Sequence, residues 1–434
     1  MFLVYTHKIT PRFTYIMKHV FTQMLGVQVV FTTKVEDFIA HEGPKITYCK
    51  QALQNEFHIK SNELLFEQGF DDIEITVQNW EEVPCFFPTS EKSVLPFDIF
   101  AASFYLLSRY EEYVPHVKDE HGRFPAKESL AYKHGFLEIP VVDVWVARLK
   151  QAILRRFPDA LFPKKQLKIL SVIDVPCAYT FKKKGLVRSI GGSITDILNF
   201  KFKRVLERYK VLFKITPDPS DNFEKLLWFR NKYHLDTIFF FLVGDYGTYD
   251  KNISINNKSF KELIKSVADY SIVSLMASYN SFKNIDVLRE ERKRLINIIN
   301  QPIKRVRLRF ARLELPQTYK DLVDADFTED YTMGYQYFVG FRAGTCTPFR
   351  FYDLSLEMQT ILKVNPICIQ DDALKAYGNS DKAEVIFYKL YDSVKKVNGY
   401  FITVFSNESM GNYGNERGFR KFYLKVYKKI CTEN

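Results

Sequence analysis

Short β-rich runs alternate with helical stretches over the second part of the chain, and this alternation constrains the fold more than any other feature. The predicted strands are 167–175, 237–243, 272–276, 306–313, 366–370 and 400–405. The helices predicted between and after them are 222–233, 259–270, 287–300, 317–325, 382–397 and 417–430. Such alternation is typical of an α/β domain with a largely parallel sheet. Six βα steps suit a barrel at least as well as an open sheet.

The first part of the chain reads as a separate unit. It ends in a stretch with two prolines, Pro158 and Pro163, which predicts a boundary between an α/β domain of unknown role at 1–163 and a second domain at 164–434. The apolar run 96–113 predicts a buried helix. Residues 1–5 read as a first strand, because they carry neither the basic leader nor the cleavage site of a signal peptide.

The composition is that of an ordinary globular protein, with 46% hydrophobic and 26% charged residues among 434. No run approaches the roughly 18 apolar residues of a membrane span, so we expect a cytoplasmic protein. The cysteines contain no CxxC pair, which argues against a zinc knuckle, a thioredoxin-type motif and a disulfide framework. They are Cys49, Cys85, Cys177, Cys346, Cys368 and Cys431.

Positive charge is concentrated in residues 181–214, which hold ten basic and two acidic residues and carry a net +8. Within it, apolar residues from Phe202 to Phe213 recur at helical spacing. One interpretation is a solvated helix that covers the barrel. The other is peripheral attachment to an anionic surface, either an inner-membrane leaflet with lipid-linked sugars or an acidic glycan. Nucleic acid is not expected, because no recognised binding module is present.

Polar, glycine-rich segments follow several predicted strands, where α/β enzymes place their sites. Asp174 stands at the end of the strand 167–175, and the segments 244–247, 330–335 and 340–349 come after later strands. Taken alone, a strand-end aspartate is more often a capping residue.

Several long blocks carry a resemblance to a known family. VIDVPCAYTFKKKG, IFFFLVGDYGTYDKN, SLMASYNSF, GFRAGTCTPFRFYDLSLE and GYFITVFSNESM resemble successive blocks of a bacterial polysaccharide deacetylase-like family, which is related to the NodB-homology carbohydrate esterases. PRFTYIMKHVF and PFDIFAASFYLLSRYEEY resemble the extra domain that precedes the deacetylase domain in that family. The resemblance implies a deformed (β/α) barrel of the polysaccharide deacetylase type, preceded by a smaller α/β domain.

The family's chemistry is metal-dependent removal of an acetyl group from an amino sugar. One Asp and two His hold a divalent ion, usually zinc, which polarises the amide and activates the attacking water. A second Asp is the base, an Arg orients it, and a late His protonates the leaving amine. The resemblance places Asp174 at the base and Arg342 at the orienting arginine, and we expect the two to form a buried ion pair.

The other family positions are occupied by residues that do not suit these roles. Pro176 stands at the metal-binding Asp, Met276 and Arg309 at the two metal-binding His, and Ser406 at the acid. From residue 135 onward the only histidine is His234, between a helix and a strand, where a helix-terminal role is expected. The remaining histidines all precede it: His7, His19, His41, His58, His116, His121 and His134.

These residues predict a non-catalytic homologue in a surface-polysaccharide pathway. It would need no cofactor, and it would either bind a glycan or lipid-linked sugar or support an active polysaccharide-biosynthesis enzyme. The substrate-binding candidates are Asp245, Tyr246, Tyr279, Asp330, Tyr331 and Tyr335. The alternative is an active carbohydrate de-N-acetylase with a rebuilt site for zinc or another divalent ion. That site would use Asp174 with Asp330 or the Asp371–Asp372 pair, for which capping and turn roles are the other interpretation.

Overall fold

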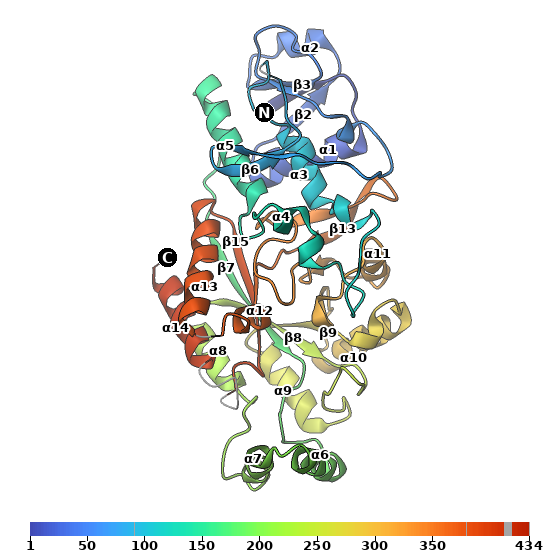
Figure 1. The fold of residues 1–434 in the computed structure, drawn as a ribbon, viewed down its shortest axis with the longest axis vertical. Coiled ribbons are helices and arrows are strands. Elements are labelled where there is room, and N and C mark those ends of the chain that lie inside the picture. Colours follow the sequence, from blue (N-terminus) through green and yellow to red (C-terminus); the bar gives the residue numbers. More distant parts are fainter. Residues whose placement is uncertain (91, 379, 412–418, 434) are drawn as a thin grey trace.

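The computed structural model describes residues 1–90, 92–378, 380–411 and 419–433. The molecule is elongated: the N-terminal region lies at one end, a large sheet in the middle and the helices α6 (Leu186–Leu198) and α7 (Phe202–Leu212) at the other end (Figure 1). Within the described ranges, no helix has the length and apolar character that crossing a bilayer requires.

The N-terminal region contains a four-stranded parallel sheet in the order β2-β1-β3-β4. Its strands are β1 (Phe2–Thr6), β2 (Val29–Thr32), β3 (Lys45–Cys49) and β4 (His58–Lys60). A separate hairpin joins β5 (Val77–Trp80) to β6 (Val83–Phe86). The helices are α1 (Pro11–Lys18), α2 (Val35–Ala40), α3 (Ile99–Leu107), α4 (Leu130–Lys133) and α5 (Val141–Arg156). The strand expected at 1–5 is therefore confirmed as β1.

Helix α3 is the buried helix that the sequence predicts, although it is shorter than 96–113. It begins after Asp98, whose Oδ1 accepts hydrogen bonds from the backbone N–H groups of Phe100 and Ala101, both at 3.0 Å. The chain leaves the helix at Arg109, which adopts a left-handed conformation with φ 56°. All nine residues of α3 are buried, so the helix is the core of the N-terminal region.

A nine-stranded sheet fills the middle of the molecule, in the order β12-β13-β11-β10-β9-β8-β7-β15-β14. Its strands are β7 (Lys168–Val175), β8 (Asp236–Leu242), β9 (Ile272–Ala277), β10 (Arg305–Leu308), β11 (Glu329–Asp330), β12 (Phe349–Asp353), β13 (Met358–Val364), β14 (Ile369–Gln370) and β15 (Tyr400–Ser406). Only the pair β12–β13 is antiparallel among these ladders. The predicted α/β class with a largely parallel sheet is confirmed.

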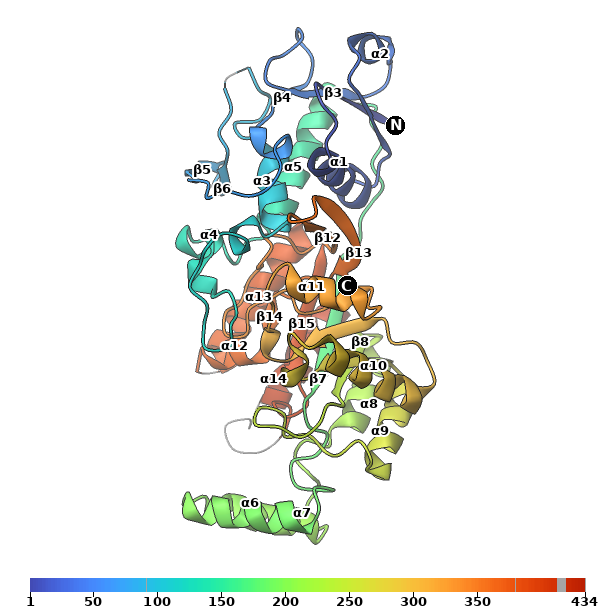
Figure 2. The same cartoon turned by 90° about the vertical axis from the view of Figure 1, so that its right-hand side faces the viewer.

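Helices cover the outer side of this sheet (Figures 1 and 2). They are α8 (Phe223–Tyr233), α9 (Lys258–Ala268), α10 (Ile285–Ile299), α11 (Gln317–Asp324), α12 (Asp371–Lys375), α13 (Ser380–Lys396) and α14 (Phe419–Thr432). The last predicted helix was expected to start at Arg417, which lies outside the described residues. His234 is the C-cap of α8, as its predicted helix-terminal role requires.

The two faces of the sheet have separate cores, because side chains alternate along each strand. Val172, Phe240 and Met276 belong to a small apolar cluster on the inner face. Ile173, Phe241 and Leu275 belong to the large cluster shared with the helices.

The expected barrel is not closed among the described residues, since the sheet ends at β12 on one side and at β14 on the other. The β12–β13 hairpin packs instead against the N-terminal region. The Tyr15 hydroxyl, from α1, donates to the carbonyl oxygen of Arg350 in β12 at 2.7 Å. Helices of the N-terminal region therefore pack against this edge of the sheet.

Candidate functional site

Asp174 and Arg307 form an ion pair at the carboxyl ends of the central strands. Arg307 Nε lies 3.0 Å from Oδ1 and 2.9 Å from Oδ2 of Asp174. Arg307 also donates to the carbonyl oxygen of Tyr331 at 2.7 Å and to Oε1 of Gln370 at 2.8 Å. The side chain of Arg307 is only 2% exposed and that of Asp174 is 16% exposed. All three guanidinium nitrogens therefore have partners within the protein.

Curvature of the sheet makes this pair possible. Asp174 lies on β7 and Arg307 on β10, with β8 and β9 between them. In a flat sheet three strand steps would separate the two backbones by about 14 Å. Burial raises the pKa of Asp174 above its ordinary value, although the Arg307 guanidinium opposes the shift.

The expected ion pair between Asp174 and Arg342 does not form. Arg342 instead binds Glu112 of the N-terminal region, with Nε 2.9 Å from Oε1 and Nη2 2.7 Å from Oε2. Arg109 donates to the same carboxylate at 2.8 Å and to the carbonyl oxygen of Arg342. Burial alone would raise the pKa of Glu112, but the two arginines hold it below its ordinary value. Arg342 thus joins the two parts of the chain and does not orient Asp174.

The four residues that the resemblance places at the metal ligands and the acid all pack against or bind other parts of the chain. Pro176 is buried, and Met276 lies in the apolar cluster of the inner face. Ser406 pairs in register with Asp174 and its backbone N–H donates to Oδ2 of Asp371 at 2.8 Å. Arg309 turns toward Asp250, with Nε 3.2 Å from Oδ1. The arginine that pairs with Asp174 is therefore Arg307. Arg309, which the resemblance places at a metal-binding His, pairs with Asp250 instead.

The carboxylates of the rebuilt metal site proposed from the sequence are directed to other partners. Oδ2 of Asp330 accepts from the Tyr319 hydroxyl at 2.8 Å and from the Thr332 N–H at 3.0 Å. Asp371 and Asp372 are the first two residues of α12, whose N-cap is Gln370 and which has no side-chain cap hydrogen bond. Oδ2 of Asp372 accepts from Gln336 at 2.6 Å. Burial, and then the Asp372 carboxylate, raise the pKa of Asp371 to about 6.

These donors do not fit a metal ion. Zinc sites in proteins need at least three converging His, Cys, Asp or Glu ligands. Within the described ranges, no group of three such residues is placed to hold a metal. Both oxygens of Asp174, which the resemblance places at the base, face a guanidinium instead.

An aromatic cluster lies beside the Arg309–Asp250 ion pair, with the Arg309 guanidinium 4.6 Å from the centre of the Phe310 ring. The cluster includes a histidine that the sequence did not indicate. The rings of Tyr249 and Tyr279 stack at 4.1 Å, and those of His121 and Phe310 stack at 5.3 Å. Nδ1 of His121 lies 3.2 Å from the Tyr279 hydroxyl. The count of histidines after residue 134 overlooked His121, because it reaches this site from the N-terminal region.

The backbone at the aromatic cluster is strained. Phe310 and Ala311 both have positive φ angles, 57° and 50°, which are uncommon for residues other than glycine. Arg123 of the N-terminal region holds them by donating to the carbonyl oxygen of Phe310 at 2.6 Å. Strain of this kind concentrates at functional sites, because the surrounding structure must be built to maintain it.

The other substrate-binding candidates lie apart from this cluster. Asp245 is exposed and pairs with Arg294 at 2.9 Å. Tyr246 lies under the guanidinium of Arg188, 4.0 Å away, at the helical end of the molecule. Tyr331 is buried in the inner core, and Tyr335 is buried beside Arg342, 5.2 Å from its guanidinium. Of the tyrosines proposed from the sequence, Tyr279 is therefore the one at the aromatic cluster.

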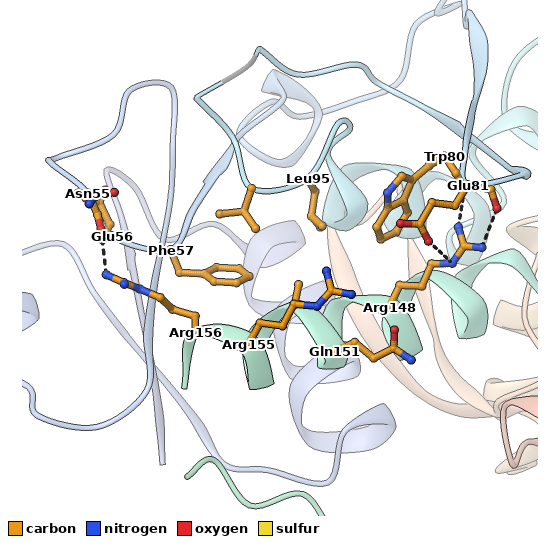
Figure 3. Close-up of a pocket in the computed structure, with 12 residues that line it drawn as sticks. Asn55, Glu56, Phe57, Trp80, Glu81, Leu95, Arg148, Gln151, Arg155 and Arg156 are labelled. Atoms are coloured by element: carbon orange, nitrogen blue, oxygen red, sulfur yellow. Dashed lines mark hydrogen bonds and ion pairs between the residues drawn. The ribbon is translucent and has the colours of Figure 1, made fainter. Parts of the chain in front are cut away.

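The N-terminal region has a concavity of its own, with a volume of about 520 Å³ (Figure 3). Arg148, Arg155 and Arg156 line one side of it from helix α5. Arg148 donates to the carbonyl oxygen of Glu81 at 2.8 Å and lies over the ring of Trp80. Most charged side chains that line this concavity therefore already have partners in the chain.

Comparisons with known proteins give one family match and matches among solved structures. Residues 2–158 match the model of a family of unknown function, DUF7033. A crystal structure of a protein assigned as a polysaccharide deacetylase from Mycobacterium smegmatis is similar with a TM-score of 0.39 and 12% identity, over 63% of this chain and 92% of that one. The polysaccharide deacetylase from Bacillus cereus gives a TM-score of 0.31 and 12% identity, over 62% and 89%. No curated protein matches the sequence.

Proposed function

We propose that this protein is a deacetylase-like glycan-binding protein of surface-polysaccharide metabolism that does not perform metal-dependent deacetylation. The observation that carries the proposal is the Asp174–Arg307 pair. A carboxylate that holds a buried guanidinium through both oxygens is neither a free base nor a metal ligand. The vacated positions Met276 and Arg309, which bring a thioether and a second cation in place of imidazoles, support the same conclusion.

The aromatic cluster supports a glycan as the ligand. Tyr249 is 43% exposed and stacks on Tyr279, so one ring surface is open to solvent beside the polar pair of Arg309 and Asp250. A sugar ring offers a C–H face to an aromatic ring and hydroxyls to charged groups. Binding sites typically combine apolar surface with a few fixed polar groups in this way.

The test combines an activity assay with a binding assay on the full chain. We expect no zinc-dependent release of acetate from N-acetylated oligosaccharides, and less than one zinc ion per chain after a weak-chelator wash. On an array of bacterial oligosaccharides we expect binding that Tyr249→Ala abolishes. Tyr270→Ala, which changes an exposed tyrosine two residues after the end of α9, is the matched control and is expected to preserve binding.

Two results would overturn the proposal. Zinc-dependent acetate release that disappears in Asp174→Asn would show that the protein is an active deacetylase with a rebuilt site. Failure of every oligosaccharide on the array to bind would remove the glycan-binding function.

A further inference from the structure

Helices α6 and α7 form a hairpin that projects from the end of the molecule opposite the N-terminal region (Figures 1 and 2). They pack on each other and lie across the long axis of the molecule. The interpretation of α7 as a solvated helix that covers the barrel is therefore wrong. The basic window 181–214 lies in and around this hairpin.

Polar groups hold the two helices together. Arg208 of α7 pairs with Asp196 of α6, and both side chains are buried. Arg208 Nη1 also donates to the carbonyl oxygen of Ser189 at 2.8 Å. Gly192 provides the space, because a Cβ atom there would lie 2.0 Å from Arg208 Nη1. The buried side of α7 thus holds an ion-paired arginine next to Val211, where a globular protein would place mainly apolar side chains.

The apolar side chains are on the outside instead. Along α6, Val187, Ile190, Ile194 and Ile197 recur at three- and four-residue spacing, on the side away from Asp196. Phe202, Leu206, Tyr209 and Phe213 recur in the same way in and just after α7, on the side away from Arg208. All eight are exposed; Val187 is 86% exposed, and Phe200 between the helices is 82% exposed. Exposed apolar residues gathered in this way at one end of a molecule mark an interaction site.

The charges around the apolar surface indicate what covers it. Residues of both helices and of the neighbouring loops line a pocket of about 640 Å³. Its lining includes Asp196 and six basic residues, which are Lys184, Arg188, Lys201, Arg204, Arg208 and Lys251. Lys203 and Lys210 are exposed beside the apolar side of α7. An apolar face bordered by lysine and arginine is the pattern of a helix that lies in the surface of an anionic membrane.

We propose that the hairpin of α6 and α7 anchors this protein to an anionic lipid bilayer, with its apolar side among the acyl chains and its cations at the lipid phosphates. The 13 residues of α6 extend for about 20 Å, which suits a helix lying in the membrane surface. A second copy of the chain is a poorer occupant, because two copies of the window 181–214, each of net charge +8, would repel each other. This inference is independent of the glycan-binding function.

The test is flotation of the full chain with vesicles of phosphatidylcholine alone, or with 30% phosphatidylglycerol. We expect the protein to float with the anionic vesicles at least tenfold more strongly than with the neutral ones, and less at high salt. The double variant Ile194→Glu/Phe202→Glu is expected to lose at least tenfold in binding. The matched control is Ile39→Glu/Leu161→Glu, which makes the same charge change at exposed residues of the N-terminal region and is expected to bind as wild type.

A second variant tests the electrostatic part. Lys203→Ala/Lys210→Ala removes two exposed cations and is expected to weaken binding to anionic vesicles at least threefold while the melting temperature stays unchanged. Equal binding by the Ile194→Glu/Phe202→Glu variant and its control would overturn the proposal. So would a concentration-dependent dimer that the same variant disrupts, because a second copy would then cover the hairpin.

Discussion

Arg307 on β10 reaches across two intervening strands to hold both carboxylate oxygens of Asp174 on β7, with its Nε at 3.0 and 2.9 Å. The pair occupies the place where the resemblance to polysaccharide deacetylases puts a catalytic base. Its existence depends on the curvature of the sheet, and its partners Gln370 and Tyr331 come from the strands and loops that complete that curvature.

Replacing Arg307 by methionine is expected to destabilise the protein by about 3 to 5 kcal/mol, because it leaves Asp174 largely buried and without its counter-charge. The double variant Asp174→Asn/Arg307→Met is expected to recover much of this loss, since no unpaired charge remains. Urea denaturation of the wild type, both single variants and the double variant measures the coupling between the two residues.

The control for this experiment is on the same strand. Arg305 is two residues earlier on β10 and pairs with Glu329 at 3.2 Å, but both side chains are partly exposed. Arg305→Met is therefore expected to cost less than about 1 kcal/mol. A cost of Arg307→Met no larger than that of Arg305→Met would contradict the structural role assigned to the pair.

The sequence predicted most of the central architecture because local patterns determine it. The apolar runs 167–175 and 237–243 became β7 and β8 nearly unchanged, since buried parallel strands read as continuous apolar stretches. The two-residue strand β11 and the hairpin β12–β13 were missed. Glu329–Asp330 is too short to have a period, and β13 alternates only weakly between exposed and buried residues.

The site was harder to predict because its contacts are not local. Asp174 and Arg307 are 133 residues apart, and only the curvature of the sheet brings them together. His121 joins the aromatic cluster from the N-terminal region, so counting histidines by sequence position gave no sign of it. The hairpin α6–α7 was partly foreseen from its charge. The spacing of its apolar residues could not show that they point outward.

Glu291 is expected to make the stability depend on pH. It is buried on α10, accepts a hydrogen bond from the Ser278 N–H at 3.0 Å, and has its pKa raised by burial to about 7 from the ordinary 4.5. The folded state therefore holds a proton that the unfolded state has released. Wild-type stability should fall as the pH rises from about 4.5 to about 7, by up to about 3 kcal/mol.

Glu291→Gln is expected to remove this dependence, because glutamine is neutral and can still accept from Ser278. The variant should match or exceed wild type in stability at pH 8 and lose that advantage at pH 4.5. Urea midpoints at the two pH values measure the effect. Glu290→Gln, at the more exposed neighbouring position, is the control. A difference between Glu291→Gln and wild type that is the same at both pH values would refute the prediction.

Glu112 is expected to couple the unfolding of the two parts of the chain. Glu112→Gln leaves the buried Arg342 without its carboxylate partner, so a loss of about 3 to 5 kcal/mol is expected. In a Trp228→Phe background the remaining tryptophans, Trp80 and Trp145, both report on the N-terminal region. Their fluorescence transition should then precede the loss of helical circular dichroism. Coincident transitions would show that Glu112 does not control the coupling.

Gly340 is another point at which the two parts of the chain meet. Its φ is 121°, and a Cβ atom would lie 2.3 Å from the carbonyl oxygen of Leu137, to which the Phe341 N–H donates at 2.7 Å. The segment 340–349, which the sequence suggested as a site loop, thus docks the N-terminal region. Gly340→Ala is expected to destabilise the protein by more than about 2 kcal/mol, because the backbone at Leu137 and the backbone at residue 340 must move apart.

Gly135→Ala separates the two causes of this loss. Gly135 also has a positive φ, 71°, but a Cβ atom there would meet nothing within 4 Å. Its replacement should cost only about 1 kcal/mol, the price of the left-handed conformation alone. Urea denaturation of both variants compares them directly. If Gly340→Ala costs no more than Gly135→Ala, the close approach to Leu137 is not what positions the N-terminal region against the sheet.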